Sequence, residues 1–117
     1  MRLEHADPAA PKGWSLGAWN SALPVNVGYA YTGVDEPHEH ARLTEIYLVA
    51  RGPAEIRIER TTLTLRAGAV LCVEPGEAHT FLSASADYFH FVLHVPGLAG
   101  AEARAEKRAV PRERLGL

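Results

Sequence analysis

Short apolar or alternating runs fill residues 14–95, and turn-forming residues separate one run from the next. The alternation is clearest in AEIRIE, where Ile56 and Ile58 share one face of a strand, and in TLTL, where Leu63 and Leu65 do the same. No stretch with a helical period lies between the runs. The pattern therefore predicts roughly eight short strands and an all-β sandwich or barrel. The runs read WSLGAWN, VNVGYAY, EIYLVA, AEIRIE, TLTLR, AVLCVE, HTFLS and DYFHFVLHV.

The length of 117 residues predicts a single domain, which buries roughly 65% of the surface that its unfolded chain exposes. We expect residues 1–13 to form a loose lead-in, residues 14–96 to form the barrel and residues 97–117 to form a C-terminal tail. The Ala, Glu, Lys and Arg content of residues 101–108 favours a short helix in this tail. An extended segment that runs back over the barrel is the alternative.

The charge balance does not indicate a polyanionic partner. Twelve basic and fourteen acidic residues leave a formal charge of −2, so we expect neither nucleic acid nor an anionic membrane to bind. No run has the length of a signal-peptide core or approaches the roughly 20 apolar residues of a membrane span, and a cytoplasmic protein is expected. The single cysteine, Cys72, lies in the apolar run AVLCV, which predicts a small buried residue and excludes a thiolate metal site.

Two histidines stand one residue apart in the segment PHEH. On a strand, His38 and His40 share a face because successive side chains point to opposite sides. Glu45 opens the next apolar run, and a tight link brings its carboxylate to the same point. His79 follows a Pro-Gly turn and can supply a fourth donor. Three imidazoles and one carboxylate suit a single divalent ion, namely Mn, Fe, Co, Ni, Cu or Zn, although each histidine taken alone reads as an ordinary core or surface residue.

The two segments that carry these residues resemble the two signatures of the cupin superfamily, as found in its small single-domain bacterial members. GVDEPHEHARLTEIYLVARG contains the His-x-His, glutamate and glycine of the first signature, and GAVLCVEPGEAHTFLS contains the glycine, Pro-x-Gly and histidine of the second. Gly33 stands one residue nearer to the first histidine than the consensus asks. Glu74 replaces a proline and Ser83 replaces an asparagine, and none of these departures touches a ligand position. The matching positions are His38, His40, Glu45, Gly52, Gly68, Gly76 and His79.

The resemblance implies a double-stranded β-helix, which is a small jelly-roll barrel, with the four ligands projecting into one end. It leaves one or two coordination positions for water or substrate, as in a catalytic rather than a structural site. It also implies a homodimer, because small members of the family often pack two barrels together. By alternation from Glu45, Tyr47 faces inward and is a candidate proton carrier, with a barrel-filling role as the alternative.

The run DYFHFVLHV divides into two faces. One face holds Tyr88, His90, Val92 and His94, and the other is wholly apolar and is expected to be buried. We place His90 in or near the pocket as the second candidate proton carrier. His94 remains open between a rim and a surface position.

These features together predict a small metal-binding cupin whose ion acts as a Lewis acid or redox centre on a small polar metabolite. The reaction types open to such a site are isomerase, dioxygenase and lyase chemistry. The alternative is a ligand-binding or sensing module without turnover. A third interpretation is a barrel whose metal is structural.

Overall fold

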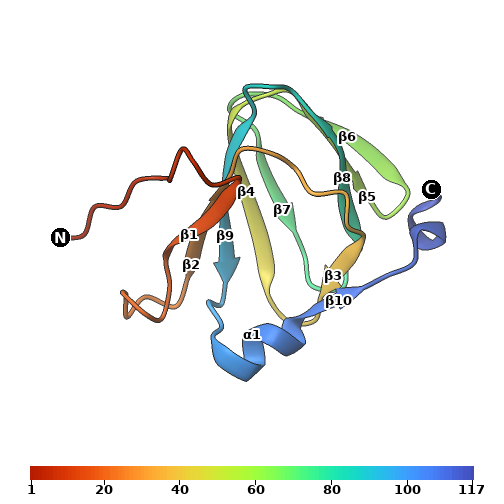
Figure 1. The fold of residues 1–117 in the computed structure, drawn as a ribbon. Helices are drawn as coiled ribbons and strands as arrows, with labels where there is room; N and C mark the ends of the chain where they lie inside the picture. The colour runs from red at the N-terminus through yellow and green to blue at the C-terminus, as the bar shows by residue number, and fades with distance from the viewer.

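The computed structural model describes all 117 residues and contains two five-stranded antiparallel sheets that face each other (Figure 1). From β3 to β9 the chain crosses repeatedly between the sheets, as in a jelly-roll barrel. The all-β jelly-roll prediction is therefore confirmed. The first sheet contains, in spatial order, β1 (Lys12–Leu16), β2 (Asn26–Ala30), β9 (Phe89–Val95), β4 (Thr44–Arg51) and β7 (Val70–Val73). The second contains β10 (Lys107–Ala109), β3 (His38–His40), β8 (His79–Ala84), β5 (Ala54–Ile58) and β6 (Thr61–Leu65).

The C-terminal tail contains both of the forms that its sequence left open. Helix α1 spans Gly100–Glu106, and strand β10 follows it at once and pairs with β3. A short 3-10 helix, η1, spans Arg112–Leu115. In Figure 1, α1 lies below the ends of β9 and β4, and the chain then follows the edge of the second sheet. Neither helix has the length and apolar character needed to cross a membrane.

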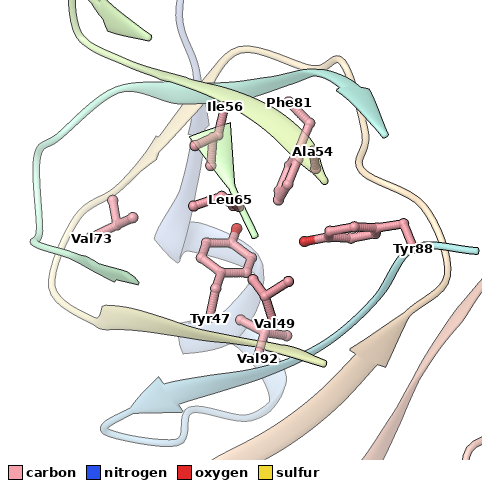
Figure 2. Close-up of a cluster of buried hydrophobic side chains, with 9 residues drawn as sticks. All are labelled: Tyr47, Val49, Ala54, Ile56, Leu65, Val73, Phe81, Tyr88 and Val92. Carbon is pink, nitrogen blue, oxygen red and sulfur yellow. The ribbon is translucent and has the colours of Figure 1, made fainter. Parts of the chain in front are cut away.

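One cluster of buried hydrophobic residues fills the barrel interior (Figure 2). Its members come from both sheets, so their packing holds the two layers together. The hydroxyl groups of Tyr47 and Tyr88 both point into this interior. The nine members are Tyr47, Val49, Ala54, Ile56, Leu65, Val73, Phe81, Tyr88 and Val92.

The apolar face of β9 lies on the outside of the barrel, so a single chain leaves this face open, contrary to the expectation that it is buried. Phe91 is 38% exposed and Val95 is 41% exposed. The half-polar face lies inside instead, where Tyr88 and His90 satisfy each other by a hydrogen bond. Cys72 is likewise exposed, on the outward face of β7, against the prediction of a buried residue. Pairing of polar groups inside the barrel, rather than hydrophobicity alone, decides which face of β9 is buried.

The β5–β6 hairpin closes through a two-residue turn with neither Gly nor Asn. Glu59 takes a positive φ of 48°, a conformation that L-residues rarely adopt. Contacts outside the hairpin hold it there. The Glu59 carboxylate accepts the N–H of Ala78 at 2.8 Å and pairs with Arg114 at 2.9 Å. The tertiary structure thus fixes a turn that local sequence does not favour.

Candidate metal centre

Three strands bring the four predicted ligands to one place. His38 and His40 lie on β3, Glu45 is near the start of β4, and His79 is the first residue of β8. Since β4 belongs to the first sheet and the other two strands to the second, the site joins the two layers. One potential ligand atom from each residue lies within 4.8 Å of the others. We call these four residues the ligand cluster.

The three imidazoles of the ligand cluster converge on one oxygen, Glu45 Oε1. Their Nε2 atoms lie 2.8 Å from it in His79, 3.1 Å in His40 and 3.9 Å in His38. Ligand atoms bound at about 2.0–2.2 Å to a common ion lie roughly 3–4 Å from one another. The separations therefore suit a single shared cation.

Backbone carbonyls fix the ring protons of two of these histidines. His38 Nδ1 lies 2.7 Å from the carbonyl oxygen of Glu36, and His79 Nδ1 lies 3.0 Å from that of Glu77. Because a carbonyl oxygen only accepts, each Nδ1 carries the proton, and the Nε2 lone pair faces the ligand cluster. A lone pair that faces a carboxylate oxygen repels it unless a proton or cation lies between them. The donor set therefore fits a bound metal ion.

The protonation states of His38 and Glu45 also fit a bound metal ion. Burial lowers the pKa of His38 to about 4, so this ring is neutral at pH 7. Burial alone would raise the pKa of the Glu45 carboxyl, but the surrounding imidazoles, among them His94, which donates to Oε2, outweigh burial and hold the pKa well below its usual value. Neutral imidazoles and an ionised carboxylate are the forms in which these groups bind metal.

His40 supplies an independent sign of a missing partner. The residue is 6% exposed, and both of its ring nitrogens are buried without a hydrogen bond. Its Nε2 approaches Glu45 Oε1 at 3.1 Å but lacks the geometry of a hydrogen bond. An unsatisfied buried polar group costs about 1–3 kcal/mol. A cation in the ligand cluster would satisfy Nε2 and remove this cost.

His94 belongs to the site. The sequence alone left its position open between the rim and the surface. Its Nε2 donates to the second carboxylate oxygen, Glu45 Oε2, at 2.8 Å. The two residues face each other in the β4–β9 ladder. The Trp14 ring packs edge-on against His94 with 4.8 Å between centroids. His94 thus fixes the far oxygen of Glu45 and leaves Oε1 to face the histidines of the ligand cluster.

The two predicted proton carriers lie deeper in the barrel. The Tyr47 hydroxyl donates to Glu45 Oε1 at 3.3 Å, and burial raises its pKa far above the usual value. His90 is 4% exposed, and its Nδ1 lies 2.6 Å from the Tyr88 hydroxyl. Burial lowers the pKa of His90 to about 4, so the ring is neutral. The ring centroids of Tyr47 and His90 are 5.0 Å apart.

A cavity of about 390 Å³ adjoins the ligand cluster, a volume typical of small-molecule sites. Tyr47 and His90 line it together with three residues of the ligand cluster. Two lysines, Lys12 and Lys107, and the indole of Trp14 also line it. The cavity thus offers both charged and aromatic groups to a ligand beside the ligand cluster.

The fold and the ligand cluster define a cupin-type barrel whose three histidines and one glutamate could hold a metal ion. The chain belongs to the AraC-like ligand-binding domain family, which matches residues 25–114. This match includes every residue of the ligand cluster. No protein of curated function matches the sequence.

Several solved structures share the fold. A variant of Streptomyces Pac13 with bound uridine is 14% identical, with a TM-score of 0.66 over 92% of this chain and 85% of that one. Pac13 itself is described as a nucleoside dehydratase. KdgF from Halomonas is 18% identical, with a TM-score of 0.64 over 79% and 86% of the two chains. A cupin from Bacteroides fragilis is 24% identical, with a TM-score of 0.58 over 86% and 89%.

Proposed function

We propose that the protein binds one divalent transition metal ion in the ligand cluster and acts on a small polar metabolite in the adjacent cavity. The observation that carries this proposal is the convergence of three imidazole Nε2 atoms on one carboxylate oxygen. The unpartnered nitrogens of His40 support it independently. The cavity of about 390 Å³ beside the ligand cluster favours a reactive site over a purely structural one.

An ion in this position supplies Lewis-acid polarisation of a bound carbonyl or hydroxyl group, with redox chemistry in addition for Fe or Cu. Side chains of the protein would donate and accept the protons of the reaction. Tyr47 keeps its proton at neutral pH because burial raises its pKa, so we assign it the role of hydrogen-bond donor. His90 is neutral and is oriented by Tyr88, so we assign it the role of proton acceptor.

Isomerase, dioxygenase and lyase chemistry remain the reaction types open to such a site. The nucleoside dehydratase among the structural neighbours is an example of elimination in a barrel of this shape. We therefore take nucleosides as candidate metabolites, together with sugars, keto acids and amino-acid derivatives, which are the small polar substrates typical of cupins.

A binding or sensing role without turnover is the second candidate function. The observation that favours it is the family itself, whose members are described as ligand-binding domains. Both functions use the same cavity. They differ in whether Tyr47 and His90 transfer protons or only hold the ligand.

We propose further that two copies associate through the outward face of the first sheet. Leu48 is paired with Val70 on one side and with Phe91 on the other, and these three side chains are 36%, 69% and 38% exposed. Such an apolar patch is typical of an interface between subunits. Sedimentation of wild-type protein should give a dimer, and Leu48→Lys should give a monomer; a monomeric wild type would contradict the proposal.

The metal proposal is tested by metal analysis of protein purified without added metal, with Glu45→Gln and Glu39→Gln compared with the wild type. Glu39 lies between the two histidines of β3, but its carboxylate pairs with Arg114 at 2.9 Å, outside the ligand cluster. The wild type and Glu39→Gln should bind about one ion per chain. Glu45→Gln should lose about 4 kcal/mol, or about a thousandfold in metal affinity, since four ligands share roughly 10–16 kcal/mol in well-studied sites.

If the wild type neither contains nor takes up a stoichiometric metal ion, the proposal is wrong. If it binds metal, a screen of the candidate metabolites separates the two functions. Turnover identifies an enzyme. A rise in melting temperature without turnover identifies a binding module.

A further inference from the structure

Glu106, the last residue of α1, is a buried acid that the proposed function does not use. Its exposed fraction is only 2%. A carboxylate at this point is disfavoured in two ways, because burial removes its hydration and because the carbonyl groups at the C-terminus of a helix carry partial negative charge. A carboxylate in this position needs compensating hydrogen-bond donors.

The donors come from the turn between β3 and β4, which consists of residues 41–43. Glu106 Oε1 accepts the backbone N–H of Arg42 and, at 2.6 Å, that of Leu43. Burial alone would raise the pKa of Glu106, but these two N–H groups and the Arg42 guanidinium outweigh burial and lower it, so the side chain is ionised at pH 7. An ionised carboxylate from the C-terminal tail thus holds this turn.

The turn joins two residues of the ligand cluster. His40 precedes it, and Glu45 follows it as the second residue of β4. The tail also contacts the backbone here, where β10 runs beside β3 (Figure 1). Lys107 pairs with His40, and the N–H of Ala41 donates to the backbone carbonyl of Glu106 at 3.0 Å. Contacts with the tail therefore set the path of the chain between His40 and Glu45.

The His40 ring depends on its backbone more than the other rings of the ligand cluster do. In His38 and His79 a backbone carbonyl accepts the Nδ1 proton and fixes the ring. His40 Nδ1 has no such partner. The place of the His40 ring opposite Glu45 therefore follows from the packing around it and from the backbone that Glu106 holds.

We propose that Glu106 is a positioning residue of the metal centre, which holds the β3–β4 turn so that His40 faces Glu45. This role rests on the proposed function, because its measure is the affinity of the ligand cluster for a metal ion. It goes beyond that function by giving the C-terminal tail a share in the site. By thermodynamic linkage, a bound ion in turn strengthens the docking of the tail on β3.

The first test compares the Zn²⁺ affinity of folded wild type, Glu106→Ala, Glu106→Gln and Glu102→Ala, by competition with a chromophoric chelator. Glu102 is the matched control, since it lies one turn earlier on α1 and its exposed carboxylate also lies near Arg42, at 3.8 Å. Loss of a group that orients a metal ligand typically costs about 10–100-fold in affinity, and Glu106→Ala should show a loss of this size. Glu106→Gln keeps one acceptor oxygen and should lose less, and Glu102→Ala should bind as the wild type does.

A double-mutant cycle distinguishes positioning from a merely structural role. In a His40→Ala background, Glu106→Ala should weaken Zn²⁺ binding by no more than about twofold, because the ring that Glu106 positions is already absent. Hydrogen exchange gives the reciprocal readout. Zn²⁺ should slow amide exchange in residues 107–110 of the wild type, and it should do so less in Glu106→Ala.

Three results would overturn this role of Glu106. They are wild-type Zn²⁺ affinity in both Glu106 variants, an equal loss from Glu106→Ala with and without the His40 ring, and tail exchange that Zn²⁺ leaves unchanged. Each of them can occur in a wild type that binds Zn²⁺, and the proposed metal centre then stands without Glu106. A wild type that binds no Zn²⁺ would contradict the metal centre and the role of Glu106 together.

Discussion

The barrel interior has a polar end and an apolar end, and the same strands build both. Along β4, Glu45 lies in the ligand cluster, Tyr47 follows on the same face, and Val49 ends in the apolar core; none is more than 5% exposed. Along β8, His79 and Phe81 make the same transition. Two strand residues, or about 7 Å, therefore separate the ligand cluster from the closely packed core.

The two ends obtain their stability in different ways. The apolar end gains free energy from burial as soon as the chain folds. The polar end buries titratable groups, which destabilise the fold unless a partner neutralises or pairs with them. The apolar end therefore holds the strands in register and keeps the polar end assembled for a cation. The following predictions test how far the two ends are independent.

The largest change in the free energy of unfolding is expected from a substitution in the apolar end. Ile56 is fully buried, and Ile56→Ala should lower the free energy of unfolding by about 3 kcal/mol through lost contacts and a cavity. Metal content per folded chain should not change. Leu23→Ala, at a position 60% exposed and outside every surface proposed above, is the control and should change stability by less than about 0.5 kcal/mol. Denaturant titration and metal analysis measure both, and loss of metal from folded Ile56→Ala would show that the ends are coupled.

A smaller change in stability, which depends on pH, is expected from His90, at the boundary between the two ends. Its pKa is lowered to about 4 in the folded protein, whereas it is about 6.5 in an unfolded chain. Below pH 6.5 the unfolded state therefore binds a proton that the folded state does not, and stability falls as the pH falls toward 4. Between pH 7 and pH 5 the loss due to this residue should be about 2 kcal/mol.

The comparison that isolates this contribution is wild type against His90→Asn, both without metal. His38, whose pKa is also lowered to about 4, contributes equally to both proteins. The slope of unfolding free energy against pH should therefore be shallower in the variant. Equal slopes would mean that His90 is not buried in its neutral form.

The smallest effect is expected from Tyr47→Phe, which removes the one hydroxyl that joins the two ends. The ring stays in the core, and only the 3.3 Å hydrogen bond to Glu45 is lost. Stability should fall by about 1 kcal/mol, with metal still bound. If the protein is an enzyme, turnover should slow, and an unchanged rate would remove Tyr47 from the mechanism.

The sequence predicted the parts of the site that depend on local spacing. His38 and His40 share a face because strand side chains alternate, and the signature spacing indicated Glu45 and His79 as their partners. The position of His94 could not be predicted in this way. It faces Glu45 only because of the register between β4 and β9. The two residues are 49 positions apart, and a local sequence pattern cannot indicate such a contact.

The outward direction of Phe91 was missed for a related reason. Alternation separates the two faces of β9 correctly, but it does not say which face points inward. The Tyr88–His90 hydrogen bond settles that choice, and it depends on both groups being enclosed by other strands.

The pairing of β10 with β3 has a practical consequence for anyone who shortens or tags this chain. Lys107 pairs with His40 and Ala109 with His38, so the three-residue strand that carries two residues of the ligand cluster has the tail as one of its two neighbours. Cutting the chain after the last barrel strand would expose β3 as an open edge. An affinity handle is therefore better placed before the first strand.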